Sequence, residues 1–183
     1  MIITLCGPPG SGKDTIAAIL EEKTGFPIMS MGNLRRAAAK KKGMTIEAFN
    51  AWSEKNPKEG DIFFDDFQKQ YAKEHDNFIM VSRMGWYFMP HALKVFIDVS
   101  LDEGARRIFE QKQKSNARNE QMVSSVTEQI ALNKQRIASD KARYMKLYGT
   151  NPYDKRHFNL IIDSSKSSAD KIASKIVKIV KNI

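Results

Sequence analysis

Nine residues near the start of the chain have the composition and spacing of a phosphate-binding loop. They are Gly7, Pro8, Pro9, Gly10, Ser11, Gly12, Lys13, Asp14 and Thr15. Three glycines let the backbone turn its N–H groups toward an anion, and a helix that begins after the loop points its positive end at the same place. The spacing Gly-x-x-x-x-Gly-Lys after an apolar run is that of a P-loop, whose lysine bridges the β- and γ-phosphates of a nucleotide. We therefore expect these residues to bind ATP.

The residue after Lys13 departs from the strict pattern, which has Ser or Thr there to hold Mg²⁺. Here it is Asp14, and Thr15 comes one position late. A carboxylate beside a triphosphate is repelled unless a cation lies between them, so one hypothesis is that Asp14 reaches Mg²⁺ through a water molecule. The alternative is that Asp14 only interacts with the helix dipole, a gain of about 0.3–1 kcal/mol. The third apolar run ends at Val81, where many P-loop enzymes have an acidic residue, and this makes Asp14 the candidate substitute.

Short apolar runs alternate with helical patterns along the whole chain. Strands are predicted at residues 2–6, 26–29, 77–81, 93–98 and 158–162. Helices are predicted between the loop and Gly25 and at about 101–113, 121–147 and 168–180, and residues 32–75 are helical with no strand. Within this helical block, Thr45 and Asp61 are predicted N-caps. The pattern indicates an α/β protein of three layers, with a five-stranded parallel sheet covered by helices on both faces.

Four segments beyond the loop resemble motifs of nucleoside monophosphate kinases, and in particular of the short archaeal-type cytidylate kinases. Residues 30–36 resemble the Ser-x-Gly-Asp-x-x-Arg segment that opens the acceptor-binding insertion of that family, with Asn33 in place of aspartate. Residues 82–86, Ser-Arg-Met-Gly-Trp, are similar to the motif after the third strand of the family. Residues 136–149 resemble the lid helix, and 158–165 the final strand. The resemblance covers essentially the whole chain in the right order.

This resemblance implies a division of the P-loop fold into three parts. The core would comprise residues of about 1–31, 77–113 and 145–183. A helical insertion at about 32–76 would bind the nucleoside monophosphate, and residues of about 114–144 would form a short lid. The polar composition of residues 112–120 separately predicts a mobile loop there. Gly32, Gly43 and Gly60 are candidate hinges for closure around both substrates.

The resemblance also implies the roles of individual residues. Transfer between two polyanions needs alignment and charge neutralisation rather than a strong base, and arginine binds phosphate bidentately and stays charged. Ser30, Gly32, Arg36 and Arg83 would hold the acceptor phosphate. Arg136 and Arg143, two helical turns apart and so on one face, would close onto the transferring group. The implied catalytic residues are Lys13, Arg83, Arg136 and Arg143, and Arg107 would pack on the adenine of ATP.

Base selection is the least determined part of the sequence. Asp65 and Gln68 resemble a position pair in archaeal-type cytidylate kinases and could read cytosine, although both could equally be polar residues on an exposed helix face. The aromatic residues Trp86, Tyr87 and Phe88 could stack on a base, but a core role for at least one is expected. Arg35, Arg106 and Arg118 are interpreted as surface charges.

Composition limits the remaining possibilities. The 183 residues suit one domain. The only cysteine, Cys6, excludes an internal disulfide and is expected to be a buried small hydrophobic residue. No run approaches the roughly 20 apolar residues of a membrane span, and the start of the chain lacks the features of a signal peptide. We expect a cytoplasmic monomer with small-molecule nucleotides, and no membrane, as partners.

The net charge of +9 favours anionic partners. Lys40, Lys41 and Lys42 are expected only to solvate a helix face. An RNA-associated ATPase is a remote alternative, and a GTPase is excluded because Asn133 and Lys134 are followed by Gln and Arg rather than by x-Asp. Adenylate kinase, or a kinase of another small acceptor, is the nearer alternative. Residues 81–83, Val-Ser-Arg, differ from the Asp-Gly-x-Pro-Arg stretch typical of adenylate kinases. The sequence therefore predicts a kinase that transfers phosphate from Mg·ATP to CMP or dCMP.

Overall fold

Five parallel strands form one sheet in the computed structural model, which describes residues 1–115 and 120–182. The strands are β1 (Ile2–Cys6), β2 (Ile28–Ser30), β3 (Phe78–Val81), β4 (Leu93–Asp98) and β5 (Leu160–Asp163). Their order is β2-β3-β1-β4-β5, and every neighbouring pair is parallel. The predicted α/β fold is confirmed. The connection that follows β1 runs to β2 on one side of it, and the connection that follows β3 crosses to β4 on the other side. The carboxyl end of β1 is therefore a topological switch point, where ligands of such sheets bind.

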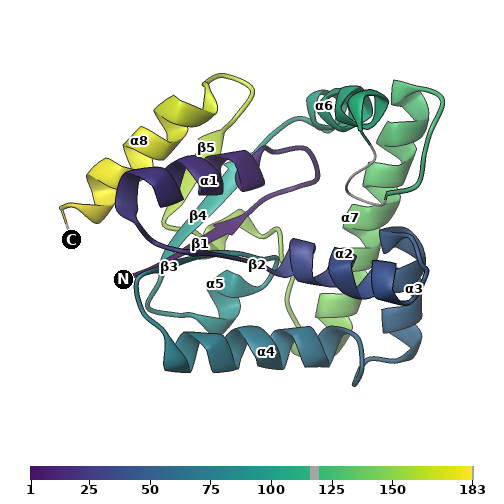
Figure 1. Ribbon diagram of the computed structural model, residues 1–183, viewed down its shortest axis with the longest axis horizontal. Helices are drawn as coiled ribbons and strands as arrows, with labels where there is room; N and C mark the ends of the chain where they lie inside the picture. The colour runs from purple at the N-terminus through teal and green to yellow at the C-terminus, as the bar shows by residue number, and fades with distance from the viewer. Residues whose placement is uncertain (116–119, 183) are drawn as a thin grey trace.

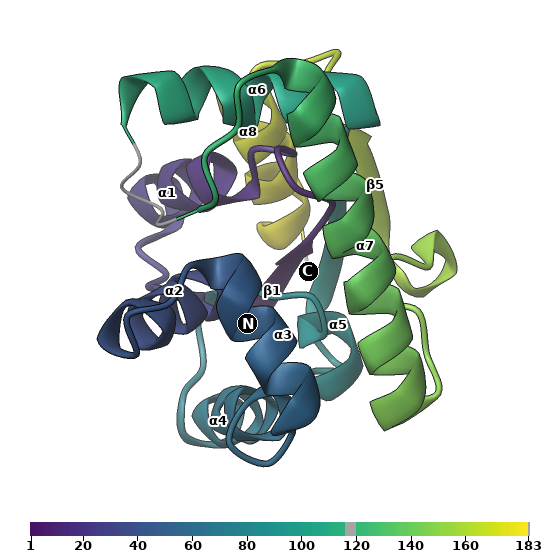
Figure 2. The same cartoon turned by 90° about the vertical axis from the view of Figure 1, so that its right-hand side faces the viewer.

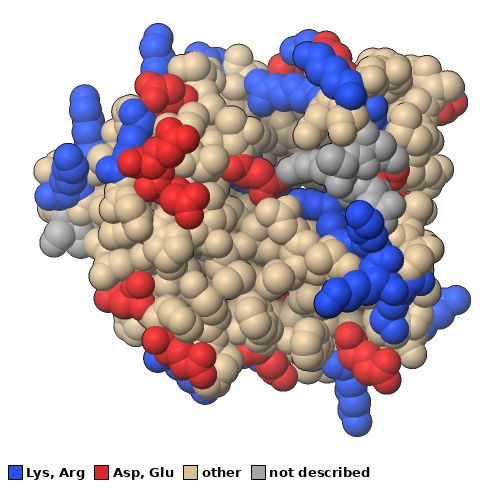
Figure 3. Space-filling view, viewed as in Figure 1, with Lys and Arg blue, Asp and Glu red and all other residues tan. Residues whose placement is uncertain are grey.

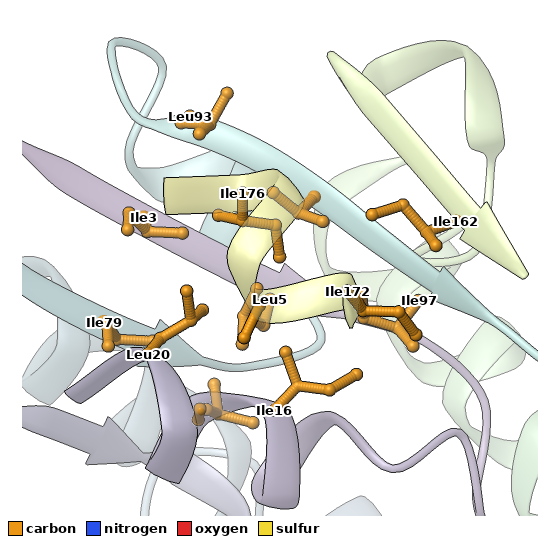
Figure 4. Close-up of a cluster of buried hydrophobic side chains, with 14 residues drawn as sticks. Ile3, Leu5, Ile16, Leu20, Ile79, Leu93, Ile97, Ile162, Ile172 and Ile176 are labelled. Carbon is orange, nitrogen blue, oxygen red and sulfur yellow. The ribbon is translucent and has the colours of Figure 1, made fainter. Parts of the chain in front are cut away.

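One face of the sheet packs on helices α1 (Lys13–Thr24) and α8 (Ala169–Val180). Alternate residues of β1 point to this face, and Ile3 and Leu5 are fully buried there. From α8, Ile172 and Ile176 meet them one helical turn apart (Figure 4). Each such side chain contributes roughly 1.5–3 kcal/mol when it is fully buried. The apolar strands and the amphipathic last helix therefore account for the main core.

The opposite face is covered by α5 (Gly85–Phe88) and by the last turns of α7 (Val126–Tyr148), while α6 (Leu101–Lys114) packs along the start of α7 (Figures 1 and 2). Cys6 and Trp86 lie in the aromatic cluster on this face. Both are core residues, as predicted, and burial raises the pKa of the Cys6 thiol to about 11. A single turn of 3-10 helix, η1 (Lys155–His157), precedes β5. Among the described residues, no helix is both long and apolar enough to cross a membrane.

Three helices lie between β2 and β3: α2 (Met31–Lys41), α3 (Ile46–Lys55) and α4 (Asp61–Glu74). Thr45 caps α3 as predicted, since its hydroxyl accepts a hydrogen bond from the backbone N–H of Ala48. The prediction for Asp61 was wrong. Gly60 is the N-cap of α4, and Asp61 is the first helical residue, with its side chain buried in ion pairs. A buried carboxylate satisfied by two guanidinium groups is more favourable here than a cap exposed to water.

The two ends of the polar segment 112–120, which was predicted to be a mobile loop, are not solvated loop residues. Lys112 is buried, and its ammonium donates to the side-chain oxygen of Gln129 at 2.8 Å and to the carbonyl of Gln121 at 2.6 Å. Glu120 is buried as well. Both side chains are polar, but they bind one another and α7 rather than water. Residues 116–119, among them Arg118, lie outside the described residues.

Candidate functional site

The loop after β1 has a shape that only glycine permits at two positions. Gly10 has φ of 78°, and a Cβ atom there would lie 2.2 Å from the carbonyl oxygen of Gly104 in α6. Gly7 has φ of 154°, and its Cβ would lie 2.0 Å from the carbonyl oxygen of Ile97 at the end of β4. The loop is therefore held tightly between β4 and α6. This geometry fixes the backbone N–H groups that a phosphate would contact.

Lys13 is partly buried in this loop, where its ammonium donates to the carbonyl of Pro8 at 3.4 Å. Burial, together with repulsion from Arg83, lowers the pKa of Lys13 to about 7. A phosphate anion would stabilise the charged form and so raise this pKa. The site is consequently prepared for an anion that it would bind through Lys13.

Two hollows meet at Lys13. The first, which we call the P-loop hollow, has a volume of about 560 Å³ and is lined by Gly10, Gly12, Lys13, Asp14, Thr15, Arg107, Ile108 and Gln111. The second, the central cleft, encloses about 860 Å³, part of it open to solvent, between the loop, α2–α4 and α7. Figure 2 shows α7 on one side and α2 with α3 on the other, with β1 between them. Gly7, Pro8 and Ser11 line neither hollow and shape the loop instead.

The sequence-predicted arginines come together in the central cleft. It is lined by Arg36, Arg83, Arg136 and Arg143, and also by Ser30, Gly32, Asp65 and Gln68. These residues come from the end of β2, from α2, α4 and α7, and from the turn after β3, so the fold brings together residues that are far apart in the sequence. Among the described residues, six Lys and Arg side chains face four Asp and Glu side chains along its wall. The cleft is suited to binding anions.

Buried carboxylates hold two of these arginines in place. Arg83 donates through Nε to Asp140 at 2.9 Å and through Nη1 to the carbonyl of Gly7 at 2.9 Å. Arg143 donates to Asp140 and to Asp61. Burial acts to raise the pKa of Asp140, but the guanidinium groups of Arg83 and Arg143 outweigh it and hold that pKa well below its usual range. Asp140 therefore stays ionised and fixes both arginines relative to the loop.

Asp140 and Arg35 are residues of this site that the sequence analysis missed. Asp140 follows Arg136 by four residues and precedes Arg143 by three, so helical spacing alone could have placed it on their face. Arg35 was interpreted as a surface charge, which is wrong. Its guanidinium binds Asp61 at 2.9 Å and Asn50 at 3.0 Å. The guanidinium also lies over the rings of Phe49 and Phe64, and aromatic faces attract a cation. These contacts and the ion pair with Asp61 together stabilise the charge of Arg35 inside the protein.

The remaining arginines have looser contacts. Arg36 donates to the side-chain oxygen of Asn33. Arg136 forms an ion pair with Glu120 at 3.8 Å. Arg107 lies in the P-loop hollow, where its guanidinium binds Glu103 at 2.8 Å and Ser164 at 3.0 Å. At 3.8 Å the Arg136–Glu120 contact is longer than a hydrogen bond, so the Arg136 guanidinium is less constrained than those of Arg83 and Arg143.

Asp65 and Gln68 are not exposed polar residues. Both are buried at the wall of the cleft, and the Gln68 amide donates to Asp65 at 2.9 Å. Burial raises the pKa of Asp65 to about 6. None of the aromatic residues at 86–88 lines the cleft. Asp65 and Gln68 are thus the polar groups of α4 that a ligand in the cleft would meet.

Lys and Arg side chains also gather outside the cleft, on the side of the molecule where α2 and α3 lie (Figure 3). Lys40, Lys41 and Lys42 are exposed there, at the end of α2. The ammonium of Lys42 lies 4.3 Å from the ring centre of Trp52. These lysines solvate a helix end, as the sequence predicted.

Among the described residues, no group of three or more His, Cys, Asp and Glu side chains could hold a metal ion. Mg²⁺ does not need such a group when phosphates supply oxygens, because it keeps several waters and takes one or two carboxylates. Of the residues that the structure describes, Asp14 is the only acidic one that lines the P-loop hollow, and it also lines the central cleft. This donor set fits a hydrated Mg²⁺ bound mainly by phosphate oxygens.

Comparison with solved structures supports the fold. An uncharacterised protein from Eubacterium ventriosum superposes with a TM-score of 0.67 at 21% identity, covering 100% of this chain and 99% of that chain. A shikimate kinase from Acinetobacter baumannii superposes with a TM-score of 0.58 at 16% identity, covering 99% and 93%. At these identities the likeness concerns the fold alone, which is that of P-loop kinases.

Comparison of sequences identifies the family. A cytidylate kinase from Archaeoglobus fulgidus is 34% identical over 181 residues, covering 98% of this chain and 94% of that protein. One from Methanobrevibacter smithii is 31% identical over 183 residues and covers 100% of both chains. The sequence model of the cytidylate kinase-like family matches residues 2–166. The chain belongs to the cytidylate kinase-like family.

Proposed function

We propose that this nucleoside monophosphate kinase transfers the γ-phosphoryl group of ATP to CMP or dCMP, giving the diphosphate and ADP. The observation that carries the proposal is the convergence of Arg36, Arg83, Arg136 and Arg143 on a cleft that meets the P-loop hollow at Lys13. A donor triphosphate in one hollow and an acceptor phosphate in the other would face each other across this lysine. A binding protein for one nucleotide would need only one of the two hollows.

The chemistry requires alignment of two anions rather than a general base. The acceptor is a phosphate oxygen that is already negatively charged, and it attacks the γ-phosphorus while the bond to the β-phosphate oxygen breaks. In this proposal, Arg36 and Arg83 hold the acceptor phosphate. Arg136 and Arg143 neutralise charge on the transferring group. Arg83 uses Nε and Nη1 on the protein, which leaves Nη2 for a phosphate oxygen.

Mg²⁺ would be held by the nucleotide phosphates and, through water, by Asp14. The chemistry that it would supply there is neutralisation of negative charge on the phosphates. Lys13 contributes a second cation at the same phosphates. Arg107, with its guanidinium fixed by Glu103 and Ser164, supplies a flat surface at the edge of the P-loop hollow for the adenine ring.

Asp65 and Gln68 support a cytosine acceptor over uracil. Cytosine carries an exocyclic amine that donates and a ring nitrogen that accepts. A carboxylate beside an amide offers the opposite pair. Helices α2–α4 would act as the acceptor-binding insertion and residues 114–144 as the lid, with Gly32, Gly43 and Gly60 as hinges.

The test is a panel of nucleoside monophosphates offered with Mg·ATP, scored for ADP release and for formation of each diphosphate. CMP and dCMP should give the highest kcat/KM. Preference for AMP would overturn the assignment of the base while leaving the kinase intact. ADP release that is equal with and without any acceptor, and stimulated by RNA in a salt-dependent way, would support an ATPase instead.

A further inference from the structure

A chain of hydrogen bonds fixes the two residues of α4 at the wall of the central cleft. The backbone N–H of Met84 donates to the hydroxyl of Ser82 at 3.2 Å, and this hydroxyl donates to Oε1 of Gln68 at 2.7 Å. Nε2 of Gln68 donates to one oxygen of Asp65 at 2.9 Å. The hydroxyl of Tyr148, from the end of α7, donates to the other oxygen at 2.9 Å. All of these contacts are buried or partly buried, so water competes with them weakly.

The direction of this chain is determined at its Asp65 end. There, an ionised carboxylate can only accept, so Gln68 has to present its NH₂ group to Asp65. At the other end, the main-chain N–H of Met84 occupies one lone pair of the Ser82 hydroxyl, whose proton goes to Oε1 of Gln68. If the Gln68 amide turned over, its oxygen would face the carboxylate and the Ser82 proton would lose its acceptor. A buried polar group that has lost its hydrogen-bond partner destabilises the protein by about 1–3 kcal/mol.

Because the direction of these hydrogen bonds is fixed, the donor and acceptor groups that remain available to a ligand are fixed as well. Gln68 retains one N–H of its amide, and Asp65 retains lone pairs on both oxygens, so the wall presents a donor next to an acceptor. The cytosine edge presents a ring nitrogen that accepts next to an amine that donates, which is complementary. The uracil edge presents N3–H and a carbonyl oxygen, which is the same pattern as the wall. Donors would then face donors, and acceptors would face acceptors.

We infer that Ser82 and Tyr148 are positioning residues that select cytosine over uracil, by holding Gln68 as a donor and Asp65 as an acceptor toward the base. This inference rests on the proposed function and goes beyond it. Neither residue needs to touch the nucleotide, and Tyr148 does not line the cleft. Both act through the orientation of the pair on α4.

The experiment compares kcat/KM for CMP and for UMP in the parent and in the Tyr148→Phe and Ser82→Ala variants. Tyr148→Phe should lower kcat/KM for CMP by about tenfold, because a hydrogen bond to a charged acceptor is lost. Ser82→Ala should lower it by about three- to tenfold. Values for UMP should stay within about twofold to threefold, so the ratio of CMP to UMP falls. The double variant should lose less than the product of the two losses, because both residues act through the same pair.

Tyr87→Phe is the matched control, because Tyr87 is exposed and its ring lies beside that of Tyr148. Among the described residues, the side-chain hydrogen bonds of Asp65 and Gln68 come from Ser82, Tyr148 and each other. Tyr87→Phe should therefore leave the ratio unchanged. A merely structural role for Ser82 and Tyr148 would lower both substrates equally and keep the ratio constant, which would overturn the inference. A parent that uses CMP and UMP equally would also overturn it and leave the kinase assignment intact. A parent that phosphorylates neither would contradict the proposed function itself.

Discussion

The two hollows that meet at Lys13 are built in different ways. The P-loop hollow is made mainly by consecutive residues, whose shape follows from glycine at positions 7 and 10 and from the start of α1. The central cleft is made by side chains from α2, α4, α7 and the turn after β3, held by ion pairs between elements. Changes in the first hollow should therefore act locally on the nucleotide, whereas changes in the second should affect chemistry and stability together.

Lys13 in the P-loop hollow and Arg143 in the central cleft also differ in what keeps them charged. Burial lowers the pKa of Lys13 to about 7, so a phosphate is needed to restore its full charge. In the cleft, burial also opposes the charge of Arg143, but Asp140 and neighbouring groups outweigh it and raise its pKa. The cleft arginines are thus kept charged by the protein, and a bound phosphate would share them with carboxylates. Weakened carboxylate contacts are the expected consequence of binding.

The largest expected effect is that of Arg143→Ala on kcat. Arginine that neutralises the transferring phosphoryl group contributes on the order of 10³-fold or more in rate. Arg143 does not line the P-loop hollow, so the Kd for ATP should change by less than about threefold. Steady-state kinetics with saturating substrates and ATP titration measure the two quantities separately. Retained ATP binding would also show that the variant is folded.

Arg106→Ala is the matched control for this change. Arg106 is exposed on α6, where it pairs with Glu103 and Glu110 on the surface. Its removal should leave kcat within about twofold of the parent. Turnover by Arg143→Ala within a few-fold of the parent would exclude Arg143 from the reaction and would make the cleft a structural assembly only.

The next largest effect is expected on stability. The carboxylate of Asp61 is shared by Arg35 and Arg143, which are both largely buried. Asp61→Asn would leave two buried cations with a neutral partner and should lower the free energy of unfolding by about 3 kcal/mol, measured by urea denaturation. Asp66→Asn, on the same helix but exposed, should cost less than about 1 kcal/mol. Equal losses in the two variants would show that the buried ion pairs do not hold the cleft together.

The same contrast explains how much could be predicted from the sequence. The P-loop, the five strands and the cap at Thr45 depend on residues close in sequence, and spacing reveals them. Asp61 and Arg35 could not be placed in this way, because their partners lie on other helices and only the folded arrangement determines whether a charge is buried. Lys112 looked mobile for the same reason, since its partner Gln129 is 17 residues away.

Arg36, Arg83, Arg136 and Arg143 are an instructive intermediate case. Their convergence was expected from family resemblance, and the structure places all four at one cleft. The acids between them were not expected, although Asp140 had a helical spacing that could have revealed it. An excess of Lys and Arg in the sequence favours the binding of anions. It does not show that the buried arginines are paired with carboxylates of the protein before any ligand binds.

Substitution of Asp14 tests how the P-loop hollow binds Mg²⁺, independently of the central cleft. If Asp14 orients Mg²⁺ through water, Asp14→Ala should raise the Mg²⁺ concentration for half-maximal rate by about tenfold, since residues of that kind typically contribute 10–100-fold in metal affinity. Asp14→Asn keeps the size of the side chain but removes its charge, and should give most of the same shift. If Asp14 acts only on the helix dipole, both variants would keep the Mg²⁺ dependence of the parent and lose about 0.3–1 kcal/mol of stability.

The smallest expected effect concerns pH and the pair on α4. The charged and titratable groups that influence Asp65 come from α2, α4 and α7, and they are Arg35, Asp61, Lys69, Tyr144 and Tyr148. Burial is the dominant influence and raises the pKa of Asp65 to about 6, against the hydrogen bond from Tyr148, which lowers it. Below this pKa the carboxyl group is protonated and no longer only accepts hydrogen bonds.

The preference for CMP over UMP should therefore fall as the pH decreases through about 6. At pH 6 the loss should be about twofold, since half of the Asp65 carboxyl groups would then be protonated. The ratio of the two substrates is the informative measurement, because the titration of Lys13 near pH 7 affects both equally. Tyr148→Phe should move the fall to higher pH, since the hydrogen bond that favours the carboxylate is lost. A ratio that is constant between pH 5 and 8 would show that the charge of Asp65 does not contribute to base selection, and the cleft would then discriminate by shape alone.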